Sequence, residues 1–192
     1  MIKIKGPFGN AVNISHAALV DQVFEGDVAV DATCGKGYDT LFLASLVGNT
    51  GKVIAFDIQQ EALAFSRQLL QKHHLLERVT FVHDNHKNMA KYIDRAIKAC
   101  MFNLGYLPGG NHDIKTRAAD TVKAVDAAIN LLIPGGIITI VFYPGHEGGQ
   151  EEMEQVLNYL AGLSQRLLEI NEIRFVNQVN KPPIAVLIKK LG

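Results

Sequence analysis

The feature that most constrains the fold of this chain is a regular alternation of apolar runs of strand length with segments of helical periodicity. Apolar runs of this kind are typical of strands buried on both faces, and their alternation with helices is typical of parallel β-α-β units. The expected strands are 27–33, 52–57, 79–83, 99–103 and 137–142, and the expected helices are 38–47, 59–73, 116–133 and 150–167. Pro134-Gly135-Gly136 predicts a tight turn before the strand at 137–142.

The last part of the chain departs from this alternation. Segments 168–176 and 184–189 both have the composition of strands, and only residues 177–183 connect them. So short a connection cannot contain a crossover helix, which predicts an antiparallel last strand. The sequence therefore predicts an α/β fold with a mostly parallel, doubly wound sheet that ends in an antiparallel strand.

Size and composition predict one domain over residues 1–192, because 192 residues with 48% hydrophobic content suffice for a single packed core. Lys plus Arg and Asp plus Glu number 19 each, so the overall charge gives no signal for nucleic acid or a membrane surface. Cys34 and Cys100 are too few for a disulfide framework, and no apolar run reaches transmembrane length. We expect a cytoplasmic protein with no membrane partner. His83 and His86 lack a third ligand at a recognisable spacing, so no metal is expected.

A motif rich in small residues, Asp31-Ala32-Thr33-Cys34-Gly35-Lys36-Gly37-Tyr38-Asp39-Thr40, stands where the first expected strand turns into the first expected helix. Open parallel sheets bind ligands at this place. Gly35 and Gly37 let backbone amides approach a cofactor, and the start of the helix favours an anionic group. A tight turn without a ligand explains the two glycines equally well. Asp57 ends the second strand where a carboxylate accepts hydrogen bonds from ribose hydroxyls, which favours an adenosine-containing cofactor.

The same loop distinguishes between adenosine cofactors. A dinucleotide site usually has a third glycine near the pyrophosphate, and Thr40 occupies that place. Asp31 would repel a pyrophosphate but would accept a hydrogen bond from the ammonium group of S-adenosylmethionine or from its bound water. Asp84-Asn85-His86 follows the third strand, where polar side chains would reach adenine; a polar loop with Asp84 as a helix cap is the alternative. S-adenosylmethionine is therefore the expected cofactor. Its expected contacts are Asp31, Thr33, Gly35, Gly37, Tyr38, Asp39, Thr40, Asp57, Ile58, Gln59, Asp84, Asn85, His86 and Asn103.

Several motifs together resemble those of a known family: the glycine motif, Phe56-Asp57-Ile58-Gln59, Phe102-Asn103-Leu104-Gly105-Tyr106-Leu107-Pro108-Gly109-Gly110, Tyr143-Pro144-Gly145-His146-Glu147-Gly148-Gly149, Asn177-Gln178 and Pro182-Pro183. Over nearly its whole length the chain resembles the class I S-adenosylmethionine-dependent methyltransferases, which have a Rossmann-like fold. More narrowly, it resembles a bacterial family whose members have been called rRNA methylases. Some of them are tRNA methyltransferases that act on the aminomethyl group of 5-aminomethyl-2-thiouridine at the wobble position. The resemblance implies this activity as an expectation.

The segment Asn103-Leu104-Gly105-Tyr106 is similar to the Asn-Pro-Pro-Tyr motif with which many amino-group methyltransferases hold their target nitrogen. In that arrangement the Asn103 side-chain oxygen accepts a hydrogen bond from the amine and orients its lone pair. Tyr106 would pack on the base. Leu104-Gly105 stands in place of the two prolines, so the similarity to that motif is looser. The alternative interpretation of Asn103 is a turn residue at the end of a strand, with no role in binding.

An alkyl ammonium must lose a proton before it can accept a methyl group, and His146 is the side chain that we expect to accept it. His112 competes for this role, and a loop histidine at the surface is the alternative. Tyr143 would stack on the uridine. The expected catalytic residues are Asn103, Tyr106 and His146, and the expected substrate contacts are Tyr106, His112, Lys115, Arg117, Tyr143 and His146.

The expected partner is tRNA, recognised at its anticodon loop, because aromatic side chains suit an unstacked base better than a duplex. Lys115 and Arg117 are reasonable phosphate contacts, or else the solvated start of a helix. An rRNA substrate, a small-molecule substrate and a non-catalytic protein that binds a dinucleotide stay open as alternatives. The oligomeric state also stays open, with a homodimer among the options.

Overall fold

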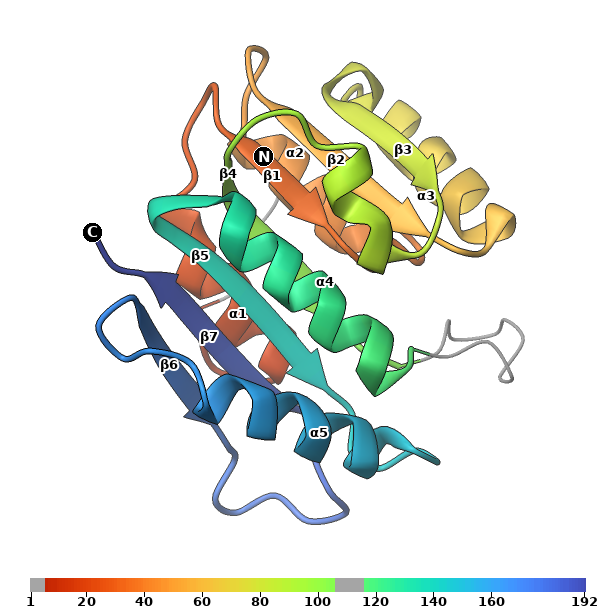
Figure 1. The fold of residues 1–192 in the computed structure, drawn as a ribbon. Coiled ribbons are helices and arrows are strands. Elements are labelled where there is room, and N and C mark those ends of the chain that lie inside the picture. Colours follow the sequence, from red (N-terminus) through yellow and green to blue (C-terminus); the bar gives the residue numbers. More distant parts are fainter. Residues whose placement is uncertain (1–5, 106–115) are drawn as a thin grey trace.

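The computed structural model describes residues 6–105 and 116–192, which form a seven-stranded sheet between two layers of helices (Figure 1). The strand order is β3-β2-β1-β4-β5-β7-β6. The first five strands are parallel, and β7 pairs antiparallel with both β5 and β6. The predicted mostly parallel sheet with an antiparallel last strand is therefore confirmed.

The helices and strands alternate along most of the chain. The strands are β1 Val28–Asp31, β2 Lys52–Asp57, β3 Val79–His83, β4 Ile97–Asn103, β5 Leu132–Phe142, β6 Leu168–Ile173 and β7 Ile184–Lys190. The α-helices are α1 Ala11–Val20, α2 Tyr38–Leu46, α3 Gln60–Lys72, α4 Ala118–Leu131 and α5 Gly149–Ala161, and the short 3-10 helices are η1 Leu76–Arg78 and η2 His86–Lys91.

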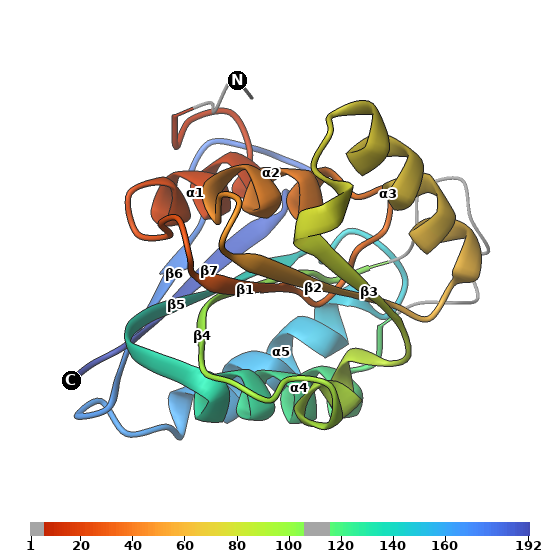
Figure 2. The same ribbon diagram turned by 90° about the horizontal axis from the view of Figure 1, so that it is seen from above.

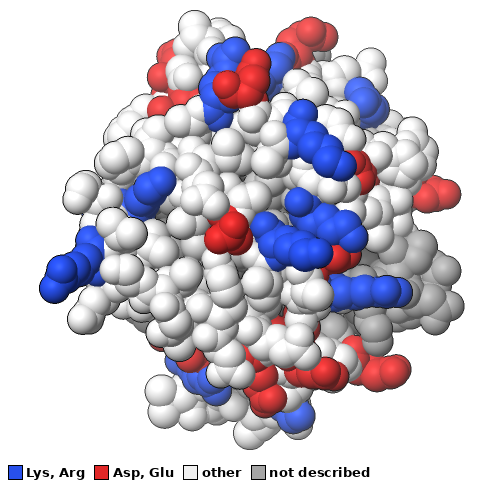
Figure 3. All heavy atoms as spheres, in the orientation of Figure 1, with Lys and Arg blue, Asp and Glu red and all other residues white. Residues whose placement is uncertain are grey.

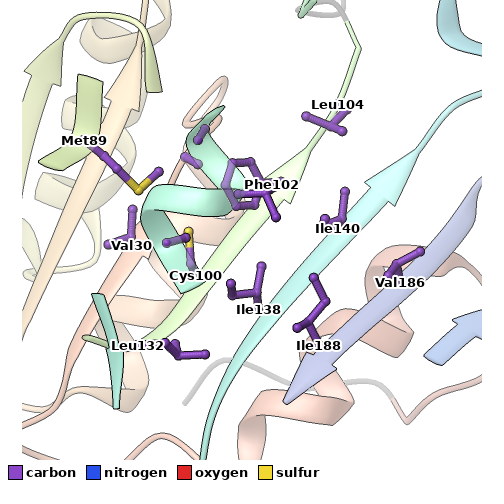
Figure 4. Packing of buried hydrophobic residues seen from close by; sticks show 14 of the residues in the cluster. Val30, Met89, Cys100, Phe102, Leu104, Leu132, Ile138, Ile140, Val186 and Ile188 are labelled. Carbon is purple, nitrogen blue, oxygen red and sulfur yellow. The ribbon is translucent and has the colours of Figure 1, made fainter. Parts of the chain in front are cut away.

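The central strands are buried on both faces, as continuous apolar runs require. Figure 2 shows α1, α2 and α3 on one side of the sheet and α4 and α5 on the other. On β4, Cys100 and Phe102 belong to the core under α4 and α5, whereas Ala99 and Met101 belong to the core under α2. Figure 4 shows the first of these cores, where Phe102 lies near Ile138 and Ile140 of the neighbouring strand. These two close-packed hydrophobic cores hold the sheet in place. They therefore also fix the positions at which its strands end.

Helix α1 is the one α-helix of the described residues that the apolar periodicity does not predict. Asn10 caps it by accepting a hydrogen bond from the backbone N–H of Asn13 at 2.8 Å. Its buried residues are Ala11, Ile14, Ser15 and Leu19, and the helix packs against β5 and β7. Apolar residues lie on most of its circumference, so no narrow stripe marks it in the sequence.

Element boundaries differ from the prediction mainly around β5 and α5. The strand β5 begins at Leu132, so Pro134-Gly135-Gly136 lies within it. The pairing with β4 is irregular there, because Leu132 pairs with Ile97 and the next paired residue, Ile137, pairs with Ala99. The tight turn expected before residue 137 is thus part of a bulged strand. Helix α5 ends at Ala161 and not near residue 167, because the backbone N–H of Gly162 closes the last turn on Tyr159 and Leu160.

Candidate active site

The carboxyl ends of β1, β2, β3, β4 and β5 meet around a cavity of about 940 Å³. Parallel strands present their carboxyl ends at one edge of the sheet, which is where α/β proteins bind ligands. Most residues that the sequence predicts for the site line this cavity: Thr33, Gly35, Tyr38, Asp39, Asp57, Ile58, Gln59, Asp84, Asn85, His86, Asn103, Arg117, Tyr143 and His146.

The glycine loop is held to β2 by Asp57. The Asp57 carboxylate accepts hydrogen bonds from the backbone N–H groups of Gly35 at 2.8 Å and of Gln59 at 2.9 Å. Each oxygen therefore keeps a lone pair for a ligand hydroxyl. Burial raises the pKa of Asp57, while the backbone donors oppose this shift. The arrangement suits the two hydroxyls of a ribose.

Gly37 has a packing role that differs from the cofactor contact expected for it. It caps α2 with φ at 82°, and a Cβ atom there would lie 2.2 Å from the Ser66 hydroxyl of α3. Only glycine allows α2 and α3 to approach so closely. Gly37 does not line the cavity, and neither does the fully buried Thr40. The direct cofactor contacts expected for both residues stay predictions.

Asp31 likewise lies beneath the cavity and not on its wall. It is fully buried, accepts a hydrogen bond from the Thr40 hydroxyl at 2.6 Å and another from the Thr33 backbone N–H at 3.1 Å. Burial, with the Asp39 carboxylate next in importance, raises the pKa of Asp31 to about 7. The expected hydrogen bond from the ammonium group, or from its bound water, to Asp31 stays a prediction. Asp39 and Asp57 line the cavity, and their carboxylates favour a cationic ligand over a pyrophosphate.

The segment after β3 contains a buried acceptor without a partner among the described residues, on a side chain that lines the cavity. The carboxylate of Asp84 accepts hydrogen bonds from the side chains of Asn88 and Tyr92 and from the backbone N–H of Asn85, and these bonds lower its pKa. His86 is buried, and its Nδ1 donates to the Ala32 carbonyl oxygen at 3.0 Å, which leaves the lone pair on Nε2. Within the described residues that Nε2 has no partner, and burial lowers the pKa of His86, so the ring is neutral. A buried acceptor without a partner fits a ligand that carries hydrogen-bond donors, as adenine and ribose do.

Asn103 lies at the centre of a side-chain network at the end of β4. Its Nδ2 donates to Oδ2 of Asp39, and its Oδ1 accepts from the Tyr143 hydroxyl at 3.2 Å. Oδ1 of Asp39 lies 2.7 Å from Nε2 of His16, on α1. Burial, followed by the Asp39 charge, raises the pKa of Tyr143, so its hydroxyl stays a donor. These contacts fix the orientation of the Asn103 amide, with Nδ2 toward Asp39 and Oδ1 toward Tyr143.

Some residues of the site were missed by sequence reasoning. Asp120 and Lys181 line the cavity, and His16 reaches it through Asp39. The dipeptide Pro182-Pro183, which carries part of the family resemblance, could have pointed to Lys181, whereas no motif marks His16. Three predicted site residues, Tyr106, His112 and Lys115, lie outside the described residues.

Two negative findings apply to the described residues alone. Over 6–105 and 116–192, no group of three or more His, Cys, Asp or Glu side chains is placed to hold a metal ion. Over the same ranges, every helix is too short or too polar to span a bilayer.

The fold, with a cavity at the carboxyl ends of its parallel strands, is that of a Rossmann-like, S-adenosylmethionine-dependent methyltransferase. Comparison with known proteins agrees. The model of the family described as "Putative rRNA methylase" matches residues 53–189, and that of "Protein-L-isoaspartate(D-aspartate) O-methyltransferase" matches residues 10–95. The chain belongs to the first of these families.

Individual relatives match over almost the whole chain. A chloroplastic tRNA (mnm(5)s(2)U34)-methyltransferase of Arabidopsis thaliana is 34% identical, over 94% of this chain and 69% of the relative. A solved "putative rRNA-methylase" from Clostridium thermocellum is 49% identical, with a TM-score of 0.94 over 96% of this chain and 99% of that one. A "putative methyltransferase" from Streptococcus mutans, solved with SAH (S-adenosylhomocysteine), is 34% identical, with a TM-score of 0.87 over 96% of this chain and 99% of that one.

Proposed function

We propose that this protein transfers a methyl group from S-adenosylmethionine to the aminomethyl nitrogen of 5-aminomethyl-2-thiouridine at the wobble position of tRNA. The observation that carries the proposal is the Asn103 amide, which stands at the end of β4 with Nδ2 bound to Asp39 and Oδ1 turned to Tyr143. An amide oxygen has two lone pairs, so Oδ1 can accept a second hydrogen bond from a substrate amine. The similarity to the Arabidopsis tRNA (mnm(5)s(2)U34)-methyltransferase supports the choice of substrate.

The residues that would hold the cofactor follow from their free hydrogen-bonding capacity. Asp57 offers two acceptor lone pairs for the ribose, and Nε2 of His86 offers one for a donor of the adenosine moiety. The carboxylates of Asp39 and Asp57, which line the cavity, favour the positive charges of the methionine part. When bound, the cofactor supplies a methyl group activated by the sulfonium charge. The SAH complex of the Streptococcus mutans relative supports this assignment.

The amine must be deprotonated and oriented before it can react. Nδ1 of His146 donates to the Glu147 carbonyl oxygen at 3.1 Å, so in the neutral ring the basic lone pair is on Nε2. His146 lines the cavity together with Asn103 and Tyr143. We assign proton acceptance to His146, orientation of the nitrogen to Asn103, and contact with the uridine to Tyr143. Such positioning alone can account for a large part of a rate enhancement.

The RNA backbone needs positive charge near the cavity. Figure 3 shows Lys and Arg side chains gathered over η2 and α4. These segments and the cap of α4 carry four exposed basic residues: Lys87, Lys91, Arg117 and Lys123. Arg117 also lines the cavity, which makes it the proposed contact for a phosphate next to the target nucleotide.

The test is methylation of tRNA that carries 5-aminomethyl-2-thiouridine, followed by mass spectrometry of the nucleosides. We expect one added methyl group on this nucleoside, no reaction with the same tRNA lacking the aminomethyl group, and activity that falls steeply with salt. Methylation of rRNA or of free metabolites in place of this tRNA would contradict the proposal.

A binding measurement separates the remaining alternative. Calorimetry should detect SAH binding, because Asp57 suits the ribose of adenosine and the Asp39 carboxylate suits the ammonium group of an amino acid. Binding of NAD without binding of SAH would indicate a dinucleotide-binding protein and would overturn the proposed activity.

A further inference from the structure

Helix α1 brings a histidine to the site from outside the β-α-β units. His16 is half-buried, and its ring stacks parallel on Phe42 of α2, with ring centroids 3.9 Å apart and planes 9° apart. Its Nε2 lies 2.7 Å from Oδ1 of Asp39. The stacking holds the ring in place, and the short contact holds the carboxylate.

The other oxygen of Asp39 is bound to the residue that we assign to the substrate amine. Oδ2 of Asp39 accepts from Nδ2 of Asn103, and Oδ1 of Asn103 accepts from the Tyr143 hydroxyl. Four side chains from four segments therefore form one linear network: His16 of α1, Asp39 of α2, Asn103 of β4 and Tyr143 after β5.

The network matters because the two ends of an amide have opposite chemistry. If the Asn103 amide turned over, Oδ1 would face the Asp39 carboxylate, where two acceptors repel, and Nδ2 would face the incoming amine and would bind the lone pair that must attack. An ionised carboxylate can only accept, so Asp39 binds the Nδ2 end and excludes the turned orientation. Asp39 can do so only while its own carboxylate plane is fixed, and His16 is the partner that fixes its other oxygen.

We propose that His16 is a positioning residue for methyl transfer, which acts through Asp39 to keep the oxygen of Asn103 directed at the substrate nitrogen. This inference rests on the proposed function of Asn103. His16 itself need not touch substrate or cofactor. The expected consequence is an effect on the methyl-transfer step with little effect on cofactor binding.

Two substitutions separate the hydrogen bond of His16 from its packing. His16→Phe keeps an aromatic ring on Phe42 but removes the N–H that faces Asp39, whereas His16→Gln keeps a donor and removes the ring. In single-turnover reactions with excess enzyme and saturating S-adenosylmethionine, we expect His16→Phe to slow methyl transfer by about tenfold to a hundredfold. His16→Gln should retain more of the parent rate, and both should bind SAH as the parent does. His73→Phe, at the exposed end of α3, is the matched control.

A double-mutant cycle tests whether His16 acts through Asn103. In an Asn103→Ala background, adding His16→Phe should slow the reaction no further, because the orientation it supports is already absent. A parent rate for His16→Phe, or an equal loss in both backgrounds, would overturn the inference.

One readout does not depend on the substrate. The side-chain amide of Asn103 should give resolved NMR signals with slow hydrogen exchange in the parent and in His16→Gln, and faster exchange in His16→Phe. If the parent fails to methylate the tRNA but these signals behave as expected, the proposed function fails and the positioning role stands. If the signals are unchanged in His16→Phe, the positioning role fails whatever the substrate.

Discussion

Replacement of Asp57 should weaken cofactor binding, and the structure gives the size of the effect. Each carboxylate oxygen of Asp57 already accepts one backbone N–H, from Gly35 or from Gln59, and has one lone pair left for a ribose hydroxyl. Hydrogen bonds to charged groups contribute about 1.5–3 kcal/mol. We therefore expect Asp57→Ala to raise the Kd for SAH roughly 10- to 150-fold, at 1.4 kcal/mol per factor of ten.

Asp57→Asn sharpens this prediction, because the usual conservative replacement should be nearly as harmful as alanine. One oxygen becomes an NH₂ group, which must then face the backbone N–H of Gly35 or Gln59. Isothermal titration calorimetry with SAH measures both variants, and Asp94→Ala, whose side chain is 88% exposed, is the matched control. If Asp57→Asn bound SAH like the parent, the proposal that both carboxylate oxygens accept a backbone N–H and a ribose hydroxyl would be refuted.

Three further predictions concern chemistry, stability and RNA binding. Asn103→Ala should leave SAH affinity near that of the parent and slow single-turnover methyl transfer on the order of a hundredfold, since misplacing a nucleophile can cost that much; an unchanged rate would exclude its role. The raised pKa of Asp31 means that the folded state binds its proton more tightly than the unfolded state, so this residue lowers the free energy of unfolding as pH rises from about 3.8 to about 7. The free energy of unfolding of Asp31→Asn minus that of the parent, measured by urea unfolding, should rise over that pH range and level off above it. A difference that does not change with pH would contradict the raised pKa of Asp31. Lys181→Glu should raise the KM for tRNA and reduce its salt dependence, whereas Lys72→Glu, away from the cavity, should change neither.

The sequence could predict the parts of the site that depend on strand ends. Parallel strands buried on both faces are apolar throughout, and β3 was predicted with the bounds that it has in the structure. Once the strands are placed, topology brings their carboxyl ends together, and so Asp57 and Asn103 were expected at the same site. Their roles there stay predictions.

The sequence could not predict what depends on contacts between distant segments. Helix α1 has no narrow apolar stripe, and the strands that it packs against, β5 and β7, follow it by more than a hundred residues in the printed sequence. His16 therefore had no visible partner. The packing of Gly37 against Ser66 and the burial of Asp31 are also tertiary effects. Gly37 and Asp31 both lie in a motif whose pattern is equally consistent with direct ligand contact.

The docking of α1 on β5 and β7 has a consequence for synthesis on the ribosome. The apolar residues of α1 leave the ribosome early, but the last strand that covers them is made only after the other six. Contacts between segments so far apart in the chain form slowly, and apolar surface that waits for its partner is prone to aggregation. The nascent chain should therefore bind chaperones through α1 until β7 has paired. Since His16 lies on this helix, the network around Asn103 would be completed only in the final step of folding, and a chain stalled before β7 would lack it.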